Sequence, residues 1–397
     1  MAPFNYDTLD HTQNQIRLIR VLRPSANESE SVRCTISTFD CDSCPEYSAL
    51  SYTWGSPNPE FEIRLDGHAF MVRDNLYQFL LSAVHCEALS INYLFVDQIC
   101  IDQSSPTEKS RLVQRMSEIF AEAKQVIAWL GAGCSPEPAV WQIHRSPSSW
   151  GTVKDEQDVI RWDCSEEMKW FKTVCSQLYW TRLWIVQELF RAKQFCLVFG
   201  GRILTHEQVR ELVRLVGWPF ISFVAIAEVF FVTGNFEKNY TTCRWALEVL
   251  TEVTLHRLDA VLCVESDFSQ HLVTDLSSVL SRFALLNCED PRDKVYGLLG
   301  IMHPEARPRV DYSMSSAQVY WSAIALCQDY QVEYYAKEFF KLGQAMHVTG
   351  TADEGVTPKA LEKFHVKFPR ISPTELFAFK SWETYADSEY YPQHDYW

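Results

Sequence analysis

The order of apolar and polar residues predicts several strands in the first third of the chain. Residues 16–22 begin with alternating apolar and polar side chains, which is typical of a strand, and residues 32–38 predict a second strand. Two short runs at 61–65 and 69–72 flank an Asp-Gly pair, a favoured two-residue turn, and therefore predict a hairpin. A further strand is expected at 47–54, where Gly55 and the prolines after it end the run.

The next segment alternates between strand and helix patterns. Residues 93–96 are a short apolar run, typical of a strand that is buried on both faces of a parallel sheet. The run Ser105-Pro-Thr-Glu108 carries the signals of a helix start, and one apolar helical stripe continues to residue 123. Residues 126–130 predict the following strand. This strand–helix–strand order predicts a βαβ unit.

These patterns together predict an α/β fold with a mainly parallel central sheet, flanking helices and a helical C-terminal region. The expected domains are residues 1–205 for the α/β part, 206–366 for a helical region packed on it, and 367–397 for an aromatic-rich tail. Further helices are expected at 75–82, 166–178, 184–189, 205–215, 294–299 and 316–329, and a further strand at 195–199.

The charge composition of the chain bears on whether it binds nucleic acid or a membrane. The 397 residues carry a formal net charge of −15 without a basic stripe, which argues against nucleic acid and against an anionic membrane surface. The apolar stretch 213–232 contains Pro219 and Glu228, so a buried helix is expected there rather than a membrane span. We therefore expect no nucleic-acid partner and no membrane span.

The first residues and the cysteines indicate the compartment. Residues 1–20 lack the continuous apolar core of a signal peptide. The 13 cysteines are scattered and odd in number, which favours reduced thiols in a cytoplasmic chain. Cys41 and Cys44 are a close pair, but no second pair of metal ligands accompanies them, so no metal site and no cofactor are predicted.

Polar residues follow the predicted strand at 93–96. Asp97 stands where that strand ends, which is the usual place of a ligand site in an open α/β sheet. Gln98, Asp102 and Gln103 lie in the same turn and are further candidates. Asp97 or Asp102 is then either an anchor or general base for a ligand, or a structural side chain that binds loop amides or caps the next helix.

A second group of candidates lies at 182–188. Glu188 follows Trp184 by four residues, so both are expected on one helix face, and a buried carboxylate there would exchange protons at a raised pKa. The alternative is an ion pair of Glu188 with Arg182 or with another arginine. Cys100 is a possible nucleophile, but no histidine is near it in the sequence, and a buried inert thiol is the competing interpretation.

Three fragments of the chain resemble, in the expected order, the signature blocks of the fungal heterokaryon-incompatibility (HET) domain family. They are Tyr47-Ser-Ala-Leu-Ser-Tyr-Thr-Trp-Gly55, Phe95-Val-Asp-Gln-Ile-Cys-Ile-Asp-Gln103 and Trp180-Thr-Arg-Leu-Trp-Ile-Val-Gln-Glu188. The resemblance implies a core similar to the Toll/interleukin-receptor domain, and a role in fungal non-self recognition and programmed cell death. It also places Trp54 beside the expected site.

Three functions are compatible with these features. The first is signalling of the incompatibility type through self-association or a protein partner. The second is a cofactor-free cyclase of the Diels–Alder type, acting on an apolar terpenoid or other secondary metabolite, for which Trp218, Phe223 and Phe230 would line an apolar cavity. The third, implied by the resemblance to Toll/interleukin-receptor domains, is NAD cleavage with Glu188 as the acid. Core packing is the alternative interpretation of the same aromatic residues.

Overall fold

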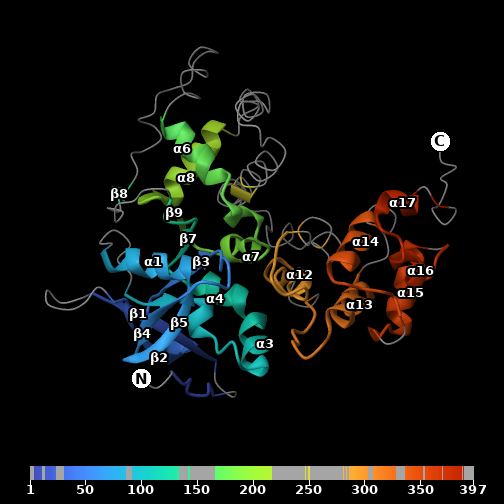
Figure 1. The fold of residues 1–397 in the computed structure, drawn as a ribbon, viewed down its shortest axis with the longest axis horizontal. Helices are drawn as coiled ribbons and strands as arrows, with labels where there is room; N and C mark the ends of the chain where they lie inside the picture. Colours follow the sequence, from blue (N-terminus) through green and yellow to red (C-terminus); the bar gives the residue numbers. More distant parts are fainter. Residues whose placement is uncertain are drawn as a thin grey trace, which may run out of the picture. The chain divides into compact units, whose positions relative to one another are not determined.

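The computed structural model describes most of the chain and divides it into two compact units (Figure 1). Unit 1 comprises residues 1–103, 119–181 and 188–265, and unit 2 comprises 104–118, 182–187 and 266–397. The domain boundaries expected after residues 205 and 366 remain a prediction. The described residues are 4–10, 14–23, 31–85, 92–133, 142–143, 166–216, 246, 249–250, 280, 283, 286–302, 307–327, 336–351, 354–368, 370–386 and 388.

The described strands of unit 1 form one sheet with the order β5-β4-β2-β1-β6-β3-β7-β9-β10-β8. Their bounds are β1 Gln15–Leu22, β2 Arg33–Asp40, β3 Ser48–Tyr52, β4 Glu60–Leu65, β5 His68–Arg73, β6 Leu94–Phe95, β7 Gln125–Trp129, β8 Gln142–Ile143, β9 Phe195–Phe199 and β10 Arg202–Thr205.

The sheet is mixed, so the prediction of a mainly parallel sheet was wrong. The central strands β6, β3, β7 and β9 are parallel to one another. The pairs β1–β2, β1–β6, β4–β5 and β9–β10 are antiparallel. Three of these pairs, β1–β2, β4–β5 and β9–β10, join consecutive strands whose connections are too short for the crossover that a parallel pair needs. The pair β1–β6 joins strands that are not consecutive, so this reason does not apply to it. The βαβ pattern applies to the middle of the sheet and not to its flanks.

Two hairpins illustrate how local sequence sets the pairing. In the predicted hairpin β4–β5, Asp66 and Gly67 have φ angles of 48° and 81°, as the two residues of a type I′ turn require. The β9–β10 hairpin turns at Gly200 and Gly201, with φ angles of 56° and 76°. Strand β10 was not predicted, because its four residues directly precede the capping signal of the next helix.

The core of unit 1 surrounds strand β3. All five of its residues are buried, as expected for a strand covered on both faces. The described helices and 3₁₀ turns of this unit are a 3₁₀ turn at Cys41–Ser43, α1 Asp74–His85, α2 Asp97–Cys100, α6 Glu166–Cys175, a 3₁₀ turn at Leu178–Thr181 and α8 His206–Val216. Two more helices, α4 Met116–Glu122 and α7 Ile185–Phe190, cross the unit boundaries.

The described part of unit 2 is helical, which confirms the predicted helical C-terminal region (Figure 1). Its helices are α3 Pro106–Gln114, α12 Asp293–Tyr296, α13 Ser316–Leu326, α14 Ala336–Ala345, α15 Pro358–Lys367, α16 Pro373–Phe377 and α17 Trp382–Ala386. The predicted single helix from 106 to 123 is divided at Arg115, whose φ and ψ angles of −102° and 3° end α3. Ser105 caps α3 as predicted, because its side chain accepts from the Glu108 amide.

Aromatic side chains connect α13 to α17. The rings of Phe340 and Phe377 stack with their centroids 6.0 Å apart, and Tyr320 contacts Phe377 edge to face. Gly343 of α14 allows this packing, because a Cβ atom there would lie 2.4 Å from the Phe377 ring. Leu376 and Tyr385 are buried, so the predicted tail is packed in unit 2 at these positions.

We expect Gly343→Ala to destabilise the protein. Alanine favours a helix over glycine by about 1 kcal/mol, but overpacking typically costs about 1–3 kcal/mol, and Phe377 cannot retreat from its stacked partner. Thermal unfolding of the full chain measures the effect, with Lys341→Ala in the same helix as control. An unchanged or higher Tm for Gly343→Ala would show that this contact is loose.

Candidate functional site

The first and second HET-like blocks meet at one edge of the sheet. Strands β3 and β6 are parallel neighbours, so their carboxyl ends lie together, and Trp54 follows one while Asp97 follows the other. The Trp54 indole Nε1 donates to Asp97 Oδ2 at 2.8 Å. The Arg73 guanidinium lies 5.0 Å from the centre of the Trp54 ring, a cation–π distance. Both Trp54 and Asp97 are half-buried.

The polar neighbours of Asp97 support the same turn. Asp97 Oδ1 accepts from the Gln98 amide at 2.7 Å, and its backbone carbonyl accepts from Gln103 Nε2 at 3.0 Å. The Tyr52 hydroxyl donates to Gln98 Oε1 at 3.3 Å. Asp97 therefore binds a loop amide, as its structural interpretation predicts, and also fixes the indole. Asp102 is half-buried and is not the cap of α3, which is Ser105.

Glu188, from the third block, contacts the buried strand β3. Glu188 is 4% exposed, and its Oε2 accepts from the Ser51 hydroxyl. Ser51 Oγ also lies 2.6 Å from the Tyr179 hydroxyl. Sequence reasoning missed Ser51 and Tyr179 as partners of this carboxylate. The available signal was a serine between Leu50 and Tyr52 in a strand expected to be buried, since a buried hydroxyl requires a polar partner.

Trp184 takes part in a separate cluster within unit 2. It precedes α7, and its Nε1 donates to Asp293 Oδ2 at 3.2 Å. The expectation that Trp184 and Glu188 serve one helix face was therefore wrong, because their side chains bind Asp293 and Ser51 respectively. Arg182 forms an isolated parallel β-bridge with Asn287.

Asp293 and Asp290 are close in sequence, but their carboxylates lie in different environments. Asp293 is 7% exposed, and the Tyr312 hydroxyl donates to its Oδ1 at 2.5 Å. Burial raises the pKa of Asp293 from 3.8 to about 6, although the hydrogen bond from Tyr312 lowers it. Asp290 instead binds the Arg292 guanidinium through both oxygens, at 2.9 and 2.7 Å. Arg292 thus forms its ion pair with a carboxylate only two residues away in the chain.

Two cations lie against the Tyr312 ring of this cluster, and a separate hydrogen bond joins Gln187 to Gly300. The Lys109 ammonium lies 4.2 Å from the centre of the Tyr312 ring, and the Arg292 guanidinium lies 5.0 Å from it. Gln187 Oε1 accepts from the Gly300 amide at 3.0 Å. A Cβ atom at Gly300 would lie 2.5 Å from Ser117, so glycine is required for this approach.

Cys100 is fully buried, and burial raises its pKa to about 12, which agrees with an inert thiol. Across the described ranges, no group of His, Cys, Asp and Glu is arranged to hold a metal ion. Within the same ranges, no helix is both long and apolar enough to cross a membrane. The cavity residues proposed from the sequence, Trp218, Phe223 and Phe230, lie outside the described residues.

Comparison with known families identifies the class of protein. Residues 47–188, which contain all three blocks, match the family described as Heterokaryon incompatibility protein (HET). This part of the chain is therefore similar to the HET domain, and the resemblance read from the blocks is confirmed.

One curated relative matches over most of the chain. It is Heterokaryon incompatibility protein 6, OR allele, of Neurospora crassa, which is 26% identical over 373 residues. The alignment covers 80% of this chain and 52% of the relative, so the chain spans about half the length of the curated protein it matches. No solved structure matches the chain.

We expect Asp293 to make the stability of the protein fall as the pH rises from about 4 to about 6. Its pKa is raised in the folded state, so over this window the folded protein keeps a proton that the unfolded chain has lost. A shift of about two units corresponds to about 3 kcal/mol. Asp293→Asn keeps an acceptor for Trp184 and cannot ionise, so the stability of the natural protein minus that of the variant should decrease across the window.

Urea unfolding at a series of pH values measures this difference. Glu362→Gln, at an exposed position of α15, is the control for general charge effects. A difference that is flat with pH, or that grows as the pH rises, would mean that Asp293 is already ionised in the folded protein at the lower end of the window.

Proposed function

We propose that this chain acts in heterokaryon incompatibility, as a protein of fungal non-self recognition that promotes cell death through self-association or contact with a protein partner. The observation that carries the proposal is the HET match over 47–188. The name of the Neurospora crassa relative supports it, although the chain covers only 52% of that protein.

The geometry of the blocks supports a signalling scaffold. Trp54 is bound by Asp97, and Glu188 is bound by Ser51, so the most characteristic side chains of the blocks hydrogen-bond one another or strand β3. The parallel group β6-β3-β7-β9 supports the further proposal that the core is of the Toll/interleukin-receptor kind. A net charge of −15 favours a protein partner over nucleic acid, and we propose a cytoplasmic location.

Neither enzymatic alternative gains support from the described residues or the comparisons. The cyclase depended on an apolar cavity near Trp218, Phe223 and Phe230, which are outside the described residues. NAD cleavage depends on Glu188, whose hydrogen bond from Ser51 fits a structural role equally well. Loss of NAD on incubation with the full chain, abolished in Glu188→Gln, would favour that alternative.

We expect overexpression of the full chain in a fungal host to arrest growth, and Trp54→Phe or Ser51→Ala to relieve the arrest. Trp54→Phe removes the indole donor to Asp97, and Ser51→Ala removes a donor to buried Glu188. The loss of a partner for a buried polar group typically costs about 1–3 kcal/mol. Colony counts measure the arrest, and immunoblots measure the protein level.

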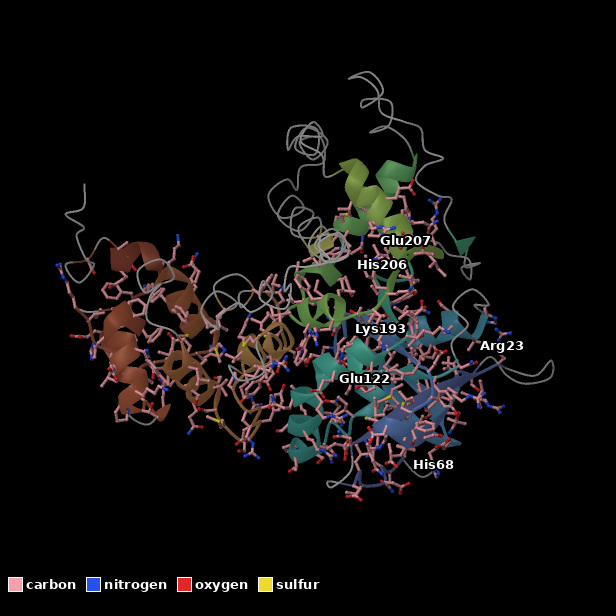
Figure 2. All side chains as sticks on the ribbon, turned by 180° about the vertical axis from the view of Figure 1, so that it is seen from behind. Arg23, His68, Glu122, Lys193, His206 and Glu207 are labelled. Carbon is pink, nitrogen blue, oxygen red and sulfur yellow. The ribbon has the colours of Figure 1, made fainter. Side chains whose placement is uncertain are left out.

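The matched control is Glu207→Gln, an exposed carboxylate on α8 that pairs with Arg210 (Figure 2). It should arrest growth as the natural chain does. If the natural chain at full expression leaves growth unchanged, the incompatibility function is refuted. If Trp54→Phe and Ser51→Ala are as toxic as the natural chain, the blocks are not the part that acts.

A further inference from the structure

Strand β5 lies at one end of the sheet order, with β4 on its inner side. The hydrogen bonds of β4 establish which groups of β5 point outward. The amides of Arg64 and Asp66 donate to carbonyls on or beside β2, each at 2.9 Å, so the alternate residues of β4 bond to β5. Given the register of the hairpin, the β5 residues whose backbone groups point away from β4 are Ala69, Met71 and Arg73.

The N-terminal segment contacts this outer edge at one end. The Phe4 amide donates to the Ala69 carbonyl at 3.3 Å, which agrees with the outward direction of Ala69. The segment then crosses toward other elements, since the Tyr6 hydroxyl donates to the Ile99 carbonyl at 2.8 Å. Among the described residues, none hydrogen-bonds the backbone of Met71 on this outer side, and its side chain is 46% exposed.

We propose that β5 is a self-association surface, where the β5 strands of two copies pair antiparallel about a two-fold axis at Met71. This inference rests on the proposed function, because it names the partner as a second copy of the chain. In that register Met71 faces Met71 of the other copy, and Phe70 faces Val72. His68 faces Asp74, the first residue of α1.

Charge selects this register and this partner. His68 and Asp74 are both exposed, and His68 lies at the lower border of unit 1 in Figure 2. A register shifted by two residues in either direction would still pair the outward-pointing backbone groups of the two strands, but His68 would no longer face Asp74. A two-fold interface requires a surface that complements itself, and a strand with a base before one end and an acid after the other meets that requirement. The Ala69 carbonyl would then exchange Phe4 for the amide of Arg73 of the other copy.

The first test uses Met71→Lys in the full chain. In the paired register two lysines would stand directly opposite each other, where like charges are destabilising. We expect the natural chain to dimerise in sedimentation equilibrium, and Met71→Lys to raise the Kd by roughly tenfold or more. Leu361→Lys, at an exposed leucine of α15 that is 37% accessible, should leave the Kd unchanged.

Two further variants test the register. Two cysteines at position 71 would be directly opposite, about 5.5 Å apart between Cα atoms, which suits a disulfide. Met71→Cys should therefore form a covalent dimer under mild oxidation with a soluble disulfide, whereas Ala69→Cys, which faces Arg73, should not. His68→Asp should weaken the dimer, and His68→Lys should preserve it.

A natural chain that stays monomeric overturns the inference, as does a dimer that Met71→Lys leaves intact. Growth arrest by a chain that is monomeric at every concentration would leave the proposed function in place and refute only the β5 contact. Loss of growth arrest in Met71→Lys alongside loss of the dimer supports both.

Discussion

The structure of the HET-like region, residues 47–188, depends on the complete burial of strand β3. All five residues of β3 are covered, yet the strand carries Ser51, and it leads directly to Trp54. A hydroxyl buried in this position requires a polar partner, which Glu188 provides from the third block. The indole two residues beyond the strand requires an acceptor, which Asp97 provides from the second block. One strand thus makes the three blocks interdependent.

Much of this arrangement could be read from the sequence, because the signals were local. The hairpin at Asp66, the cap at Ser105 and the position of Asp97 after a buried strand each follow from a few adjacent residues. The direction of the strands could not be read in the same way. The two-residue strand β6 is buried and pairs parallel with β3 on one side but antiparallel with β1 on the other, so its apolar run could not indicate the direction of both neighbours.

The side-chain partners that were missed are distant in sequence. Ser51 and Tyr179 are 128 residues apart, and Trp184 and Asp293 are 109 residues apart. No periodicity connects such positions, and only the folded chain brings them together. The expectation for Trp184 failed for a local reason as well. Four-residue spacing places two side chains on one face only within a helix, and α7 begins after Trp184.

The buried carboxylates Glu188 and Asp293 both accept hydrogen bonds from other side chains, which indicates what they contribute to the protein. Glu188 is 4% exposed and accepts from Ser51. Asp293 is 7% exposed and binds both Trp184 and Tyr312. Carboxylates placed in this way stabilise a particular conformation. The proposed pairing of β5 with a second copy requires such a conformation, because the edge strand can present its outward backbone groups only if the strands behind it hold their register.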